Sequence, residues 1–349
     1  MTSLPSIYKT IRINKIFEEV PGFKTFVFDD DHGIKYKAGQ YLTLVAHLRG
    51  EEVRRSYSIT SSPELNESLS IGVKRKANGY FSRLLVDLAV PGDELITTGA
   101  GGLFILPEET QSYKQLFFFA AGSGITPIYS LLKTALKRYP LLPLVLIYSN
   151  TSPATAVFLE KINELKEQFN DRFLLELLFS NAPDLIKARL HRELLIYFLN
   201  HYSIADSLSI LYYICGPYPY MRMCTYVLQE FQVPYDNIKK ENFIIDQVRP
   251  PQAMPPDINT RLVKINYAGK LYSVPVHFPD SILHASKKKG VVLPYSCETG
   301  RCGNCLARKL KGNVWLSYNE VLTDSDLDKG LTLTCVGHPV GGDVELEIF

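Results

Sequence analysis

Four of the six cysteines lie in the C-terminal part of the 349-residue chain, at a spacing that suits an iron–sulfur cluster. Three share the run CETGRCGNC, and with the fourth they give the pattern C-x4-C-x2-C…C of plant-type 2Fe-2S centres. Glycines in this run let the backbone turn tightly around two irons and two sulfides. Because four thiolates leave no open position for substrate, the pattern predicts electron transfer. The predicted ligands are Cys297, Cys302, Cys305 and Cys335.

A closed zinc site with four cysteine ligands is the alternative for the same residues. Zinc sites more often use two short cysteine pairs, and Cys335 has no cysteine close to it in sequence. A histidine-ligated cluster is disfavoured because His338 is the only histidine after Cys297. The remaining cysteines, Cys215 and Cys224, stand apart and are expected to be reduced thiols.

A glycine-rich turn follows an apolar segment in the middle of the chain and predicts a nucleotide site. The run reads LFFFAAGSGITPIYSLL, a buried strand followed by a helix. Free N–H groups and the positive helix end at such a junction hold pyrophosphate. A proline replaces the last glycine of the G-x-G-x-x-G pattern, so a turn without a ligand is the alternative. The candidate residues are Gly122, Ser123, Gly124, Thr126 and Pro127.

A second candidate lies after the apolar run LSILYYI, where Cys215-Gly216-Pro217 follows. The carboxyl ends of parallel strands face the ligand crevice in an open sheet, which places these residues there. A buried thiol beside a turn is the alternative. Nucleophilic chemistry at Cys215 is disfavoured because no histidine partner is evident.

Two N-terminal motifs suit a flavin. Arg55-Ser56-Tyr57-Ser58 lies on a predicted strand, whose alternation places Arg55 and Tyr57 on one face. An arginine can hold a phosphate and a tyrosine ring can stack on a flavin, whereas a solvated Arg and a packed Tyr are the alternative. Gly79-Tyr80-Phe81-Ser82 opens a short helix, where the Ser82 hydroxyl can cap the helix or bind phosphate.

The elements around these motifs predict three segments. Residues 1–108 contain short β-rich runs separated by turn residues, which predicts an antiparallel barrel with one short helix near residues 81–88. Residues 112–245 alternate strands with helices, which predicts a parallel sheet flanked by helices over 127–139, 156–169, 186–200 and 220–231. After the proline-rich run DQVRPPQAMPPDINT, a hairpin turning near Ala268–Gly269, a short helix and further strands follow.

Composition excludes several classes of protein. With 46% apolar residues and a net charge of +2, the chain is neither disordered nor suited to long-range attraction to nucleic acid or an anionic membrane. Glycines and a proline interrupt the apolar stretches that approach the length of a membrane span. The N-terminus lacks the apolar core of a secretory signal, which predicts a cytoplasmic protein.

Together with Glu241-Asn242-Phe243, the order of these motifs makes the chain resemble the ferredoxin–NADP reductase superfamily joined to a C-terminal plant-type ferredoxin domain. This resemblance implies an FAD-binding β-barrel domain over residues 1–108 and a Rossmann-like NAD(P)-binding α/β domain over residues 109–246. A linker over residues 247–260 and a β-grasp 2Fe-2S domain over residues 261–349 would follow.

The resemblance also implies roles for individual residues. Arg55 would bind the flavin pyrophosphate, Tyr57 would stack on the ring system and Ser58 would approach N5. The other implied FAD contacts are Gly79, Phe81, Ser82 and Phe243. The loop 122–127 would take the NAD(P) pyrophosphate, and Cys215, Gly216 and Pro217 would lie by the nicotinamide. Tyr57, Ser58 and Cys215 are thus the candidate catalytic residues.

The preference between NADPH and NADH stays open at this stage, with NADPH placed first. The superfamily often has a basic residue after the second parallel strand, whereas this chain has Tyr148-Ser149-Asn150-Thr151 there. Arg189 is a candidate anion partner for the extra phosphate, and a solvated arginine near a helix start is its alternative.

The implied reaction is hydride transfer from NAD(P)H to FAD, then single-electron transfer through the cluster to a partner protein. Within the superfamily the chain is most similar to the reductase component of phenylacetyl-CoA epoxidase and its relatives, which implies an oxygenase as acceptor. A Rieske oxygenase, a desaturase, a hybrid-cluster protein or a heme protein are alternative acceptors. A zinc-stabilised nucleotide-binding sensor is the alternative from another class.

Overall fold

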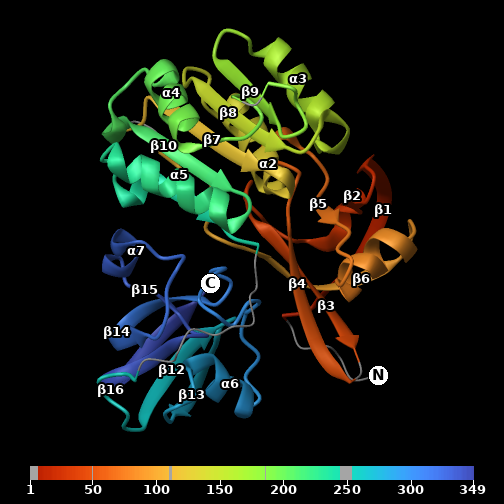
Figure 1. Cartoon of the computed structure of the whole chain (residues 1–349). Helices are drawn as coiled ribbons and strands as arrows, with labels where there is room; N and C mark the ends of the chain where they lie inside the picture. The colour runs from red at the N-terminus through yellow and green to blue at the C-terminus, as the bar shows by residue number, and fades with distance from the viewer. Residues whose placement is uncertain (1–6, 49, 110–111, 185, 244–253) are drawn as a thin grey trace. The chain divides into compact units, whose positions relative to one another are not determined.

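The computed structural model describes residues 7–48, 50–109, 112–184, 186–243 and 254–349. The chain divides into two compact units (Figure 1). One contains Lys9–Ala100 and Phe104–Phe243, and the other contains Ile244–Phe349 with Met1–Tyr8 and Gly101–Leu103. We call residues 9–100 the barrel lobe, residues 112–243 the parallel-sheet lobe and residues 254–349 the C-terminal unit.

The barrel lobe is a six-stranded antiparallel sheet in the order β4-β3-β6-β1-β2-β5. Its strands are β1 (Lys9–Val20), β2 (Phe23–Phe28), β3 (Tyr41–Leu48), β4 (Glu51–Ser58), β5 (Ser70–Lys74) and β6 (Glu94–Gly101). A bridge between Ile59 and Ile71 joins the two ends of the sheet, just past β4 and within β5. The predicted barrel is thus confirmed, and side chains such as Phe26 and Leu42 fill its interior.

A short helix follows β5, as the sequence predicts. It begins as α1 (Tyr80–Arg83) and continues as a π-helical turn over Leu84–Leu88. Arg75 fixes this segment through an ion pair with Asp87, in which Arg75 Nε lies 2.8 Å from Asp87 Oδ1.

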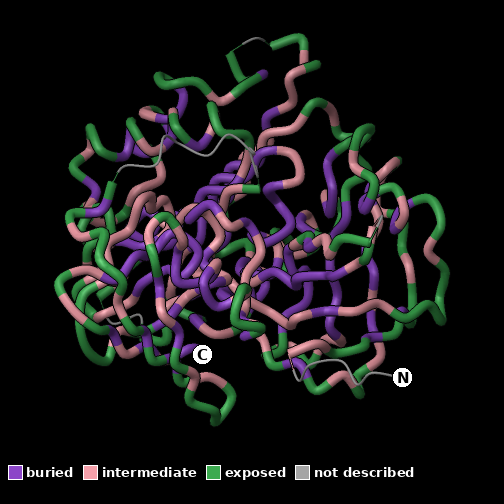
Figure 2. The backbone as a smooth tube through the Cα atoms, turned by 90° about the horizontal axis from the view of Figure 1, so that it is seen from below, coloured by how far each residue is buried: buried purple, intermediate pink, exposed green. Residues whose placement is uncertain are grey.

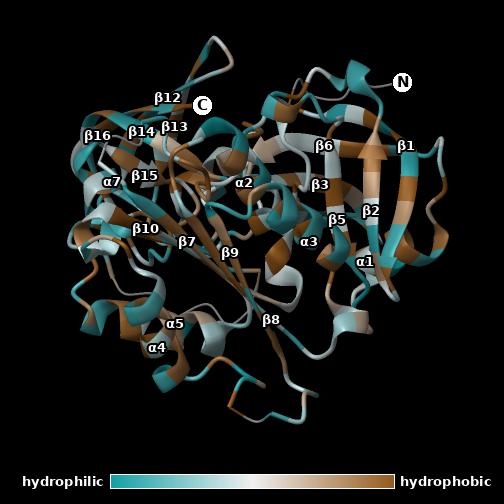
Figure 3. Ribbon diagram, turned by 90° about the horizontal axis from the view of Figure 1, so that it is seen from above, coloured by the Kyte–Doolittle hydropathy of each residue, from teal (hydrophilic) through white to brown (hydrophobic). Residues whose placement is uncertain are grey.

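The parallel-sheet lobe has five parallel strands in the order β11-β10-β7-β8-β9. The strands are β7 (Gln115–Ala121), β8 (Leu144–Asn150), β9 (Phe173–Phe179), β10 (Ile210–Cys215) and β11 (Ile238–Glu241). Helices α2 (Ile125–Arg138) and α3 (Leu159–Gln168) pack on one face, and α4 (Arg192–Tyr202) and α5 (Tyr218–Glu230) pack on the other. Because both faces are covered, the central strands are almost wholly apolar, as the hydropathy colours of Figure 3 show.

Two helices begin later than their sequence patterns predict. The helix expected over 156–169 begins at Leu159, because Phe158 has the left-handed backbone angle φ of +61° and cannot continue a helix. The helix expected over 186–200 covers Arg192–Tyr202, because His191 Nδ1 accepts a hydrogen bond from Leu194 N and caps the helix there. In both cases apolar residues before the helix continue its apolar spacing, so the sequence pattern predicts a start that is too early.

The C-terminal unit contains a five-stranded mixed sheet in the order β13-β12-β16-β14-β15. Its elements are β12 (Arg261–Tyr267), β13 (Lys270–Val276), α6 (Ile282–Lys288), β14 (Leu306–Leu316), α7 (Asp324–Asp328), β15 (Leu331–Leu333) and β16 (Gly337–Ile348). The first hairpin turns at Ala268 and Gly269, both with positive φ, as the sequence predicts. The linker expected over residues 247–260 lies outside the described residues up to position 253.

Each unit has its own core of apolar side chains. In Figure 2 the buried segments run through the central strands and the exposed segments lie in outer loops. No helix among the described residues is both long and apolar enough to cross a bilayer.

Candidate functional site

The glycine loop and the Cys215 segment meet at the carboxyl ends of neighbouring strands. β7 and β10 pair in parallel with Cys215 opposite Ala120, so the residues that follow both strands emerge at one edge. Gly122–Gly124 form a single helical turn between β7 and α2. Both loops therefore face the edge of the sheet at which open α/β folds bind ligands.

Glycine is required where these two loops touch. A Cβ atom on Gly124 would lie 2.1 Å from the backbone oxygen of Cys215, and a Cβ atom on Gly216 would lie 2.9 Å from the Cβ of Ala121. These distances are too short for any other residue, so the backbones of the two loops lie in direct contact at this edge. Backbone N–H groups at a helix start of this kind can hold a pyrophosphate.

The barrel lobe contributes to the same site through the end of β4. Ser58 Oγ donates a hydrogen bond of 3.3 Å to Glu241 Oε2, at the end of β11. β11 pairs with β10 so that Glu241 lies opposite Cys215. Ser58, Glu241 and Cys215, which are far apart in sequence, are therefore neighbours in the fold.

Burial keeps the acidic groups of this site protonated. It raises the pKa of Glu241 to about 8, against the smaller opposite effect of the Ser58 hydrogen bond. Burial also raises the pKa of the Cys215 thiol well above its ordinary value, and the Glu241 carboxyl adds to that shift. A thiol with such a pKa is a poor nucleophile, in agreement with the sequence analysis.

The N-terminal flavin motifs lie on β4 and α1. Tyr57 contacts Phe81 at the start of α1, with ring centroids 6.1 Å apart and the planes inclined by 45°. Arg55 is exposed on the same strand, and its Nη1 donates to its neighbour's carbonyl, Arg54 O, over 2.7 Å. Ser82 Oγ donates to Gly79 O and accepts from Lys76 N, so this hydroxyl shapes the turn that opens the helix.

The remaining candidates lie near the ends of β10 and β11 and ahead of α4. Phe243 is exposed directly after β11, and Pro217 precedes α5. Arg189 is exposed and precedes α4 by three positions, a placement that fits both the proposed anion contact and a solvated arginine near a helix start. In the segment that replaces the expected basic residue, Asn150 Nδ2 donates to Tyr148 Oη and Thr155 O.

The four C-terminal cysteines come together in one loop region. Contact with Cys302 and Cys335 lowers the pKa of Cys297, and contact with Cys297 raises the pKa of Cys302 and Cys335. These opposite shifts mean that the sulfur atoms of Cys297, Cys302 and Cys335 lie within reach of one another and that these three thiols cannot all ionise without a cation. All four donors are soft sulfur atoms, which fits an iron–sulfur cluster.

The backbone of the cysteine loop also suits a cluster. Gly300 and Gly303 have φ of +74° and +73°, and a Cβ on Gly300 would lie 2.8 Å from Tyr318 O. Thr299 N donates to Cys297 Sγ over 3.4 Å. Thr299 Oγ1 and Asn304 Nδ2 are buried without a hydrogen-bond partner in the described part of the chain, so polar groups remain for the sulfur atoms of a cluster.

Ion pairs link the cysteine loop to neighbouring segments at Glu298 and at Arg301. Burial opposes ionisation of Glu298, yet bonds from His284 and Lys287 hold its pKa at about 2. Arg301 Nε lies 3.3 Å from Glu320 Oε2, and its side chain is only 16% exposed. A largely buried cation therefore lies beside the predicted ligand Cys302.

Sequence models of three domain families match successive parts of the chain. The family described as oxidoreductase FAD-binding domain matches residues 10–105, and the oxidoreductase NAD-binding domain matches residues 118–225. The 2Fe-2S iron-sulfur cluster binding domain matches residues 265–340. The ferredoxin reductase component of 3-ketosteroid-9-alpha-monooxygenase from Mycobacterium tuberculosis is 30% identical over 353 residues, which cover 96% of this chain and 94% of that protein. The chain belongs to the ferredoxin reductases that carry their own 2Fe-2S domain.

Other relatives of this reductase match it over nearly the whole chain. A component of 1,2-phenylacetyl-CoA epoxidase from Escherichia coli is 29% identical over 320 residues, covering 90% of this chain and 88% of that one. The solved structure of phthalate dioxygenase reductase has a TM-score of 0.58 at 22% identity and covers 98% of both chains. That likeness shows the fold, including the C-terminal sheet domain predicted from the sequence.

The reductase is thus an oxidoreductase with domains for FAD, a nicotinamide nucleotide and a 2Fe-2S cluster, as the sequence predicted. One residue of the site was not singled out from the sequence. Glu241 was noted only as part of a motif, although it lies between Ser58 and Cys215. The signal that could have identified it is its position. Glu241 is a charged residue at the end of a short strand, two positions before Phe243.

Proposed function

We propose that this reductase moves electrons from NAD(P)H to FAD, then to the 2Fe-2S cluster, and delivers them to an oxygenase component. The observation that carries the proposal is the meeting of the glycine loop, Cys215, Ser58 and Glu241 in one unit of a chain that also holds four clustered thiols. A hydride carries two electrons and a 2Fe-2S cluster accepts one, and FAD supplies the conversion between them when bound.

Residues of the barrel lobe would hold the flavin. The exposed Arg55 guanidinium suits the pyrophosphate, and Tyr57, half-buried against Phe81, offers a ring face for stacking. Gly79 and Ser82 form a turn at a helix start that suits phosphate, and Phe243 of the parallel-sheet lobe would cover the ring system. Protonated Glu241 holds the Ser58 hydroxyl in place beside the reacting centre.

Residues of the parallel-sheet lobe would hold the nicotinamide nucleotide. The loop of Gly122, Ser123, Gly124, Thr126 and Pro127 would bind the pyrophosphate through its N–H groups. Cys215, Gly216 and Pro217 would line the nicotinamide. The protonated thiol and carboxyl place no negative charge there, so the nicotinamide can approach the flavin without electrostatic conflict.

The C-terminal unit would hold the cluster through Cys297, Cys302, Cys305 and Cys335. We assign FAD to residues 1–108, the nucleotide to residues 109–246 and the cluster to residues 261–349, with residues 247–260 as linker. Iron and acid-labile sulfide assays, together with flavin extraction, check this assignment. A colourless protein that contains zinc would contradict it.

The preference for NADPH over NADH depends on a positive charge near the adenine ribose. Arg189 is the candidate for that charge, because the end of β8 carries Asn150, which makes local hydrogen bonds, and no basic residue follows it in the Tyr148–Thr151 segment. Steady-state turnover with both nucleotides, repeated with Arg189→Ala, tests this role. An unchanged ratio of kcat/KM values would exclude Arg189.

The acceptor is proposed at the level of an oxygenase component. Similar identity to components of steroid monooxygenase, phenylacetyl-CoA epoxidase and glycine betaine monooxygenase supports this level. Phenylacetyl-CoA epoxidase is the specific acceptor that we propose to test first, with a Rieske-type oxygenase in parallel. Reduction of the diiron epoxidase component by NAD(P)H and this reductase is the expected result, and reduction of the Rieske protein alone would redirect the proposal.

A further inference from the structure

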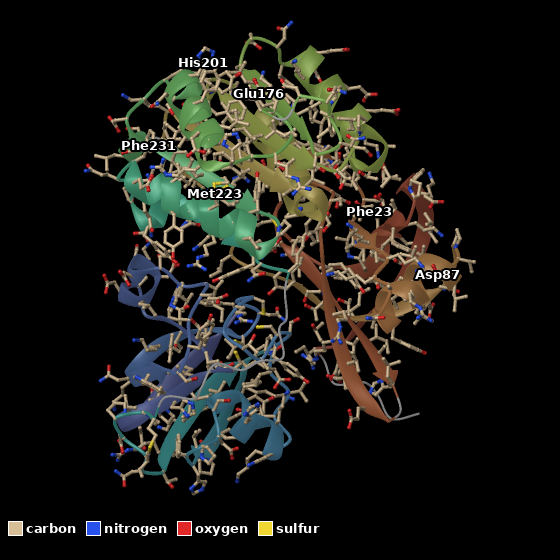
Figure 4. All side chains as sticks on the ribbon, viewed as in Figure 1. Phe23, Asp87, Glu176, His201, Met223 and Phe231 are labelled. Carbon is tan, nitrogen blue, oxygen red and sulfur yellow. The ribbon has the colours of Figure 1, made fainter. Side chains whose placement is uncertain are left out.

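Helix α2 joins the two lobes of the first unit through side chains that the cofactor motifs do not include. The glycine loop leads directly into this helix, and the helix packs against the segment of the barrel lobe that follows β4. The contacts include the ion pairs Lys133–Glu67 and Arg138–Glu64 and two hydroxyl hydrogen bonds, and Tyr129 of the helix supports the ring that meets Phe23. Figure 4 labels Phe23, which lies on the barrel side of this contact.

The ion pair with the more buried cation joins Lys133 of α2 to Glu67 of the barrel lobe. Lys133 Nζ lies 2.5 Å from Glu67 Oε2 and 2.7 Å from Glu67 Oε1, and the lysine side chain is only 9% exposed. Glu67 Oε2 also accepts from Ser62 N over 2.8 Å. The geometry of this pair is constrained mainly from the lysine side, because a buried ammonium group without its carboxylate would be strongly unfavourable.

Two hydroxyl groups of α2, three positions before Lys133 and one position after it, extend the contact. Ser130 Oγ donates to Ser61 O over 2.6 Å, and Thr134 Oγ1 donates to Ser62 Oγ over 2.7 Å. All four of these residues are buried. Because these hydrogen bonds are buried and join specific partners, they fix the position of α2 along its axis relative to residues 61–62 of the barrel lobe.

An aromatic stack lies on the other side of the ion pair. The rings of Tyr129 and Phe158 stack with centroids 4.5 Å apart, and Phe23 of β2 meets Phe158 edge-on at 6.0 Å. Lys133 Nζ lies 4.5 Å from the Tyr129 ring centroid. Phe158 takes a left-handed φ of +61°, a strained conformation that the surrounding contacts maintain.

A further ion pair, between Lys161 and Glu19, lies beside the aromatic stack. Lys161 Nζ contacts both Glu19 oxygens at 2.8 Å and lies 5.3 Å from the Phe158 ring centroid. In both of these ion pairs the lysine belongs to the parallel-sheet lobe and the glutamate to the barrel lobe, so the two contacting faces carry opposite charges. We call Glu67, Lys133, Tyr129 and Phe158 the interlobe latch.

The glycine loop itself reaches the barrel beside the latch. A Cβ atom on Gly72 of β5 would lie 2.6 Å from Thr126 Cγ2 and 2.7 Å from Phe23 Cζ. Only glycine allows this approach, so the residue proposed to bind nucleotide phosphate packs directly on the barrel.

The hydrogen-bonded serines beside the latch lie close in sequence to both cofactor sites. Ser61 follows Ser58 by three positions, and Ser130 follows Thr126 by four, which is about one helical turn. We infer that the interlobe latch is a positioning device that sets the distance between the nicotinamide and the flavin. The inference rests on the proposed hydride transfer, and none of the latch residues belongs to the proposed cofactor-binding motifs.

The inference predicts a specific kinetic effect. An interaction that only positions the two cofactors changes the hydride-transfer rate in the bound complex and leaves nucleotide affinity nearly unchanged, whereas a displacement near 1 Å can lower a rate by about a hundredfold. Removing a structural contact without a positioning role would change stability alone.

The test uses the full-length holoprotein with FAD and cluster bound, in anaerobic stopped-flow reduction by NADPH and by NADH. The combined variant Glu67→Gln with Lys133→Met removes both charges and leaves neither unpaired. We expect the flavin reduction rate at saturating nucleotide to fall by about tenfold or more, with the half-saturating concentration within about threefold of wild type. The long-wavelength charge-transfer absorbance of the reduced flavin with bound nucleotide should weaken in parallel.

Lys133→Arg keeps the charge and should retain most of the rate and absorbance. Arg192→Met is the matched control, because Arg192 pairs with Glu230 on the exposed surface, within the parallel-sheet lobe. If the combined variant does not retain FAD, Tyr129→Leu removes the stack without exposing a charge and should lower the same rate.

A combined variant, or Tyr129→Leu where that is used, with wild-type rate and charge-transfer absorbance would overturn the inference. Failure of the proposed function is distinguishable, because wild-type flavin would then remain oxidised with both nucleotides.

Discussion

Ser58 and Glu241 are hydrogen-bonded although 183 positions separate them in the chain, with Ser58 Oγ donating to Glu241 Oε2 over 3.3 Å. The bond links the end of β4 in the barrel lobe to the end of β11 in the parallel-sheet lobe. Burial raises the pKa of Glu241 to about 8, so the carboxyl is largely protonated at neutral pH. The site thus contains a neutral acid whose proton is available to hydrogen-bond a neighbour.

Glu241→Gln should reduce the pH dependence of stability. The native carboxyl keeps its proton up to about pH 8, whereas the unfolded one loses it near its ordinary pKa of 4.5. Between these values the native state binds more protons, so this contribution to stability is complete below pH 4.5 and lost as pH rises through 8. The free energy of unfolding should fall by about 2–3 kcal/mol more in wild type than in the variant between about pH 6 and about pH 8. Thermal unfolding of the holoprotein across this range measures the difference, and parallel profiles would contradict it.

Gly124→Ala should weaken nucleotide binding and destabilise the first unit. The new methyl group would lie 2.1 Å from Cys215 O, so the two loops must separate, at a cost of about 1–3 kcal/mol. Gly33→Ala is the control, because it adds the same methyl group where no atom lies within 4 Å, and only the positive φ of Gly33 opposes it. Titration of NADPH and NADH, with thermal unfolding, checks both variants. A Gly33 variant that weakens nucleotide binding as strongly would show that the close approach to Cys215 does not matter.

Cys335→Ser should remove the cluster and leave the flavin reaction intact. We expect loss of most iron, acid-labile sulfide and cluster absorbance, with NAD(P)H still reducing FAD, because the two sites lie in separate units. Electron delivery to an acceptor should then stop. Cys224→Ser is the control, since Cys224 is buried within α5 and distant in sequence from the ligands. A variant at Cys335 that retains full iron and sulfide content would refute its assignment as a ligand.

Arg301→Met and Glu320→Gln should shift the cluster potential in opposite directions. Arg301 lies one position before Cys302, and its buried cation favours the reduced, more negative cluster. Removing it should lower the midpoint potential, whereas removing the Glu320 charge should raise it. Spectroelectrochemical titration of the holoprotein measures both shifts, with the exposed Arg308→Met as control. Shifts of the same sign in the two variants would exclude an electrostatic effect.

The sequence by itself determined the three-part architecture and the presence of a 2Fe-2S domain, and it predicts the four cysteine ligands. Cysteine spacing, strand alternation and the strand–turn–helix order around Gly122 are local patterns. Such patterns can be recognised without knowing how distant segments pack. The same reasoning placed the starts of α3 and α4 too early, because apolar periodicity does not report the left-handed Phe158 or the cap at His191.

Only the tertiary structure decided which residues meet. Glu241 lies between Ser58 and Cys215 because β11 pairs with β10 and the barrel lobe packs beside them, and Lys133 finds Glu67 across the two lobes. Such contacts depend on the packing of distant segments, and no spacing in the sequence encodes them. The pKa of Glu241 is likewise a property of its burial, which exists only once the chain is folded.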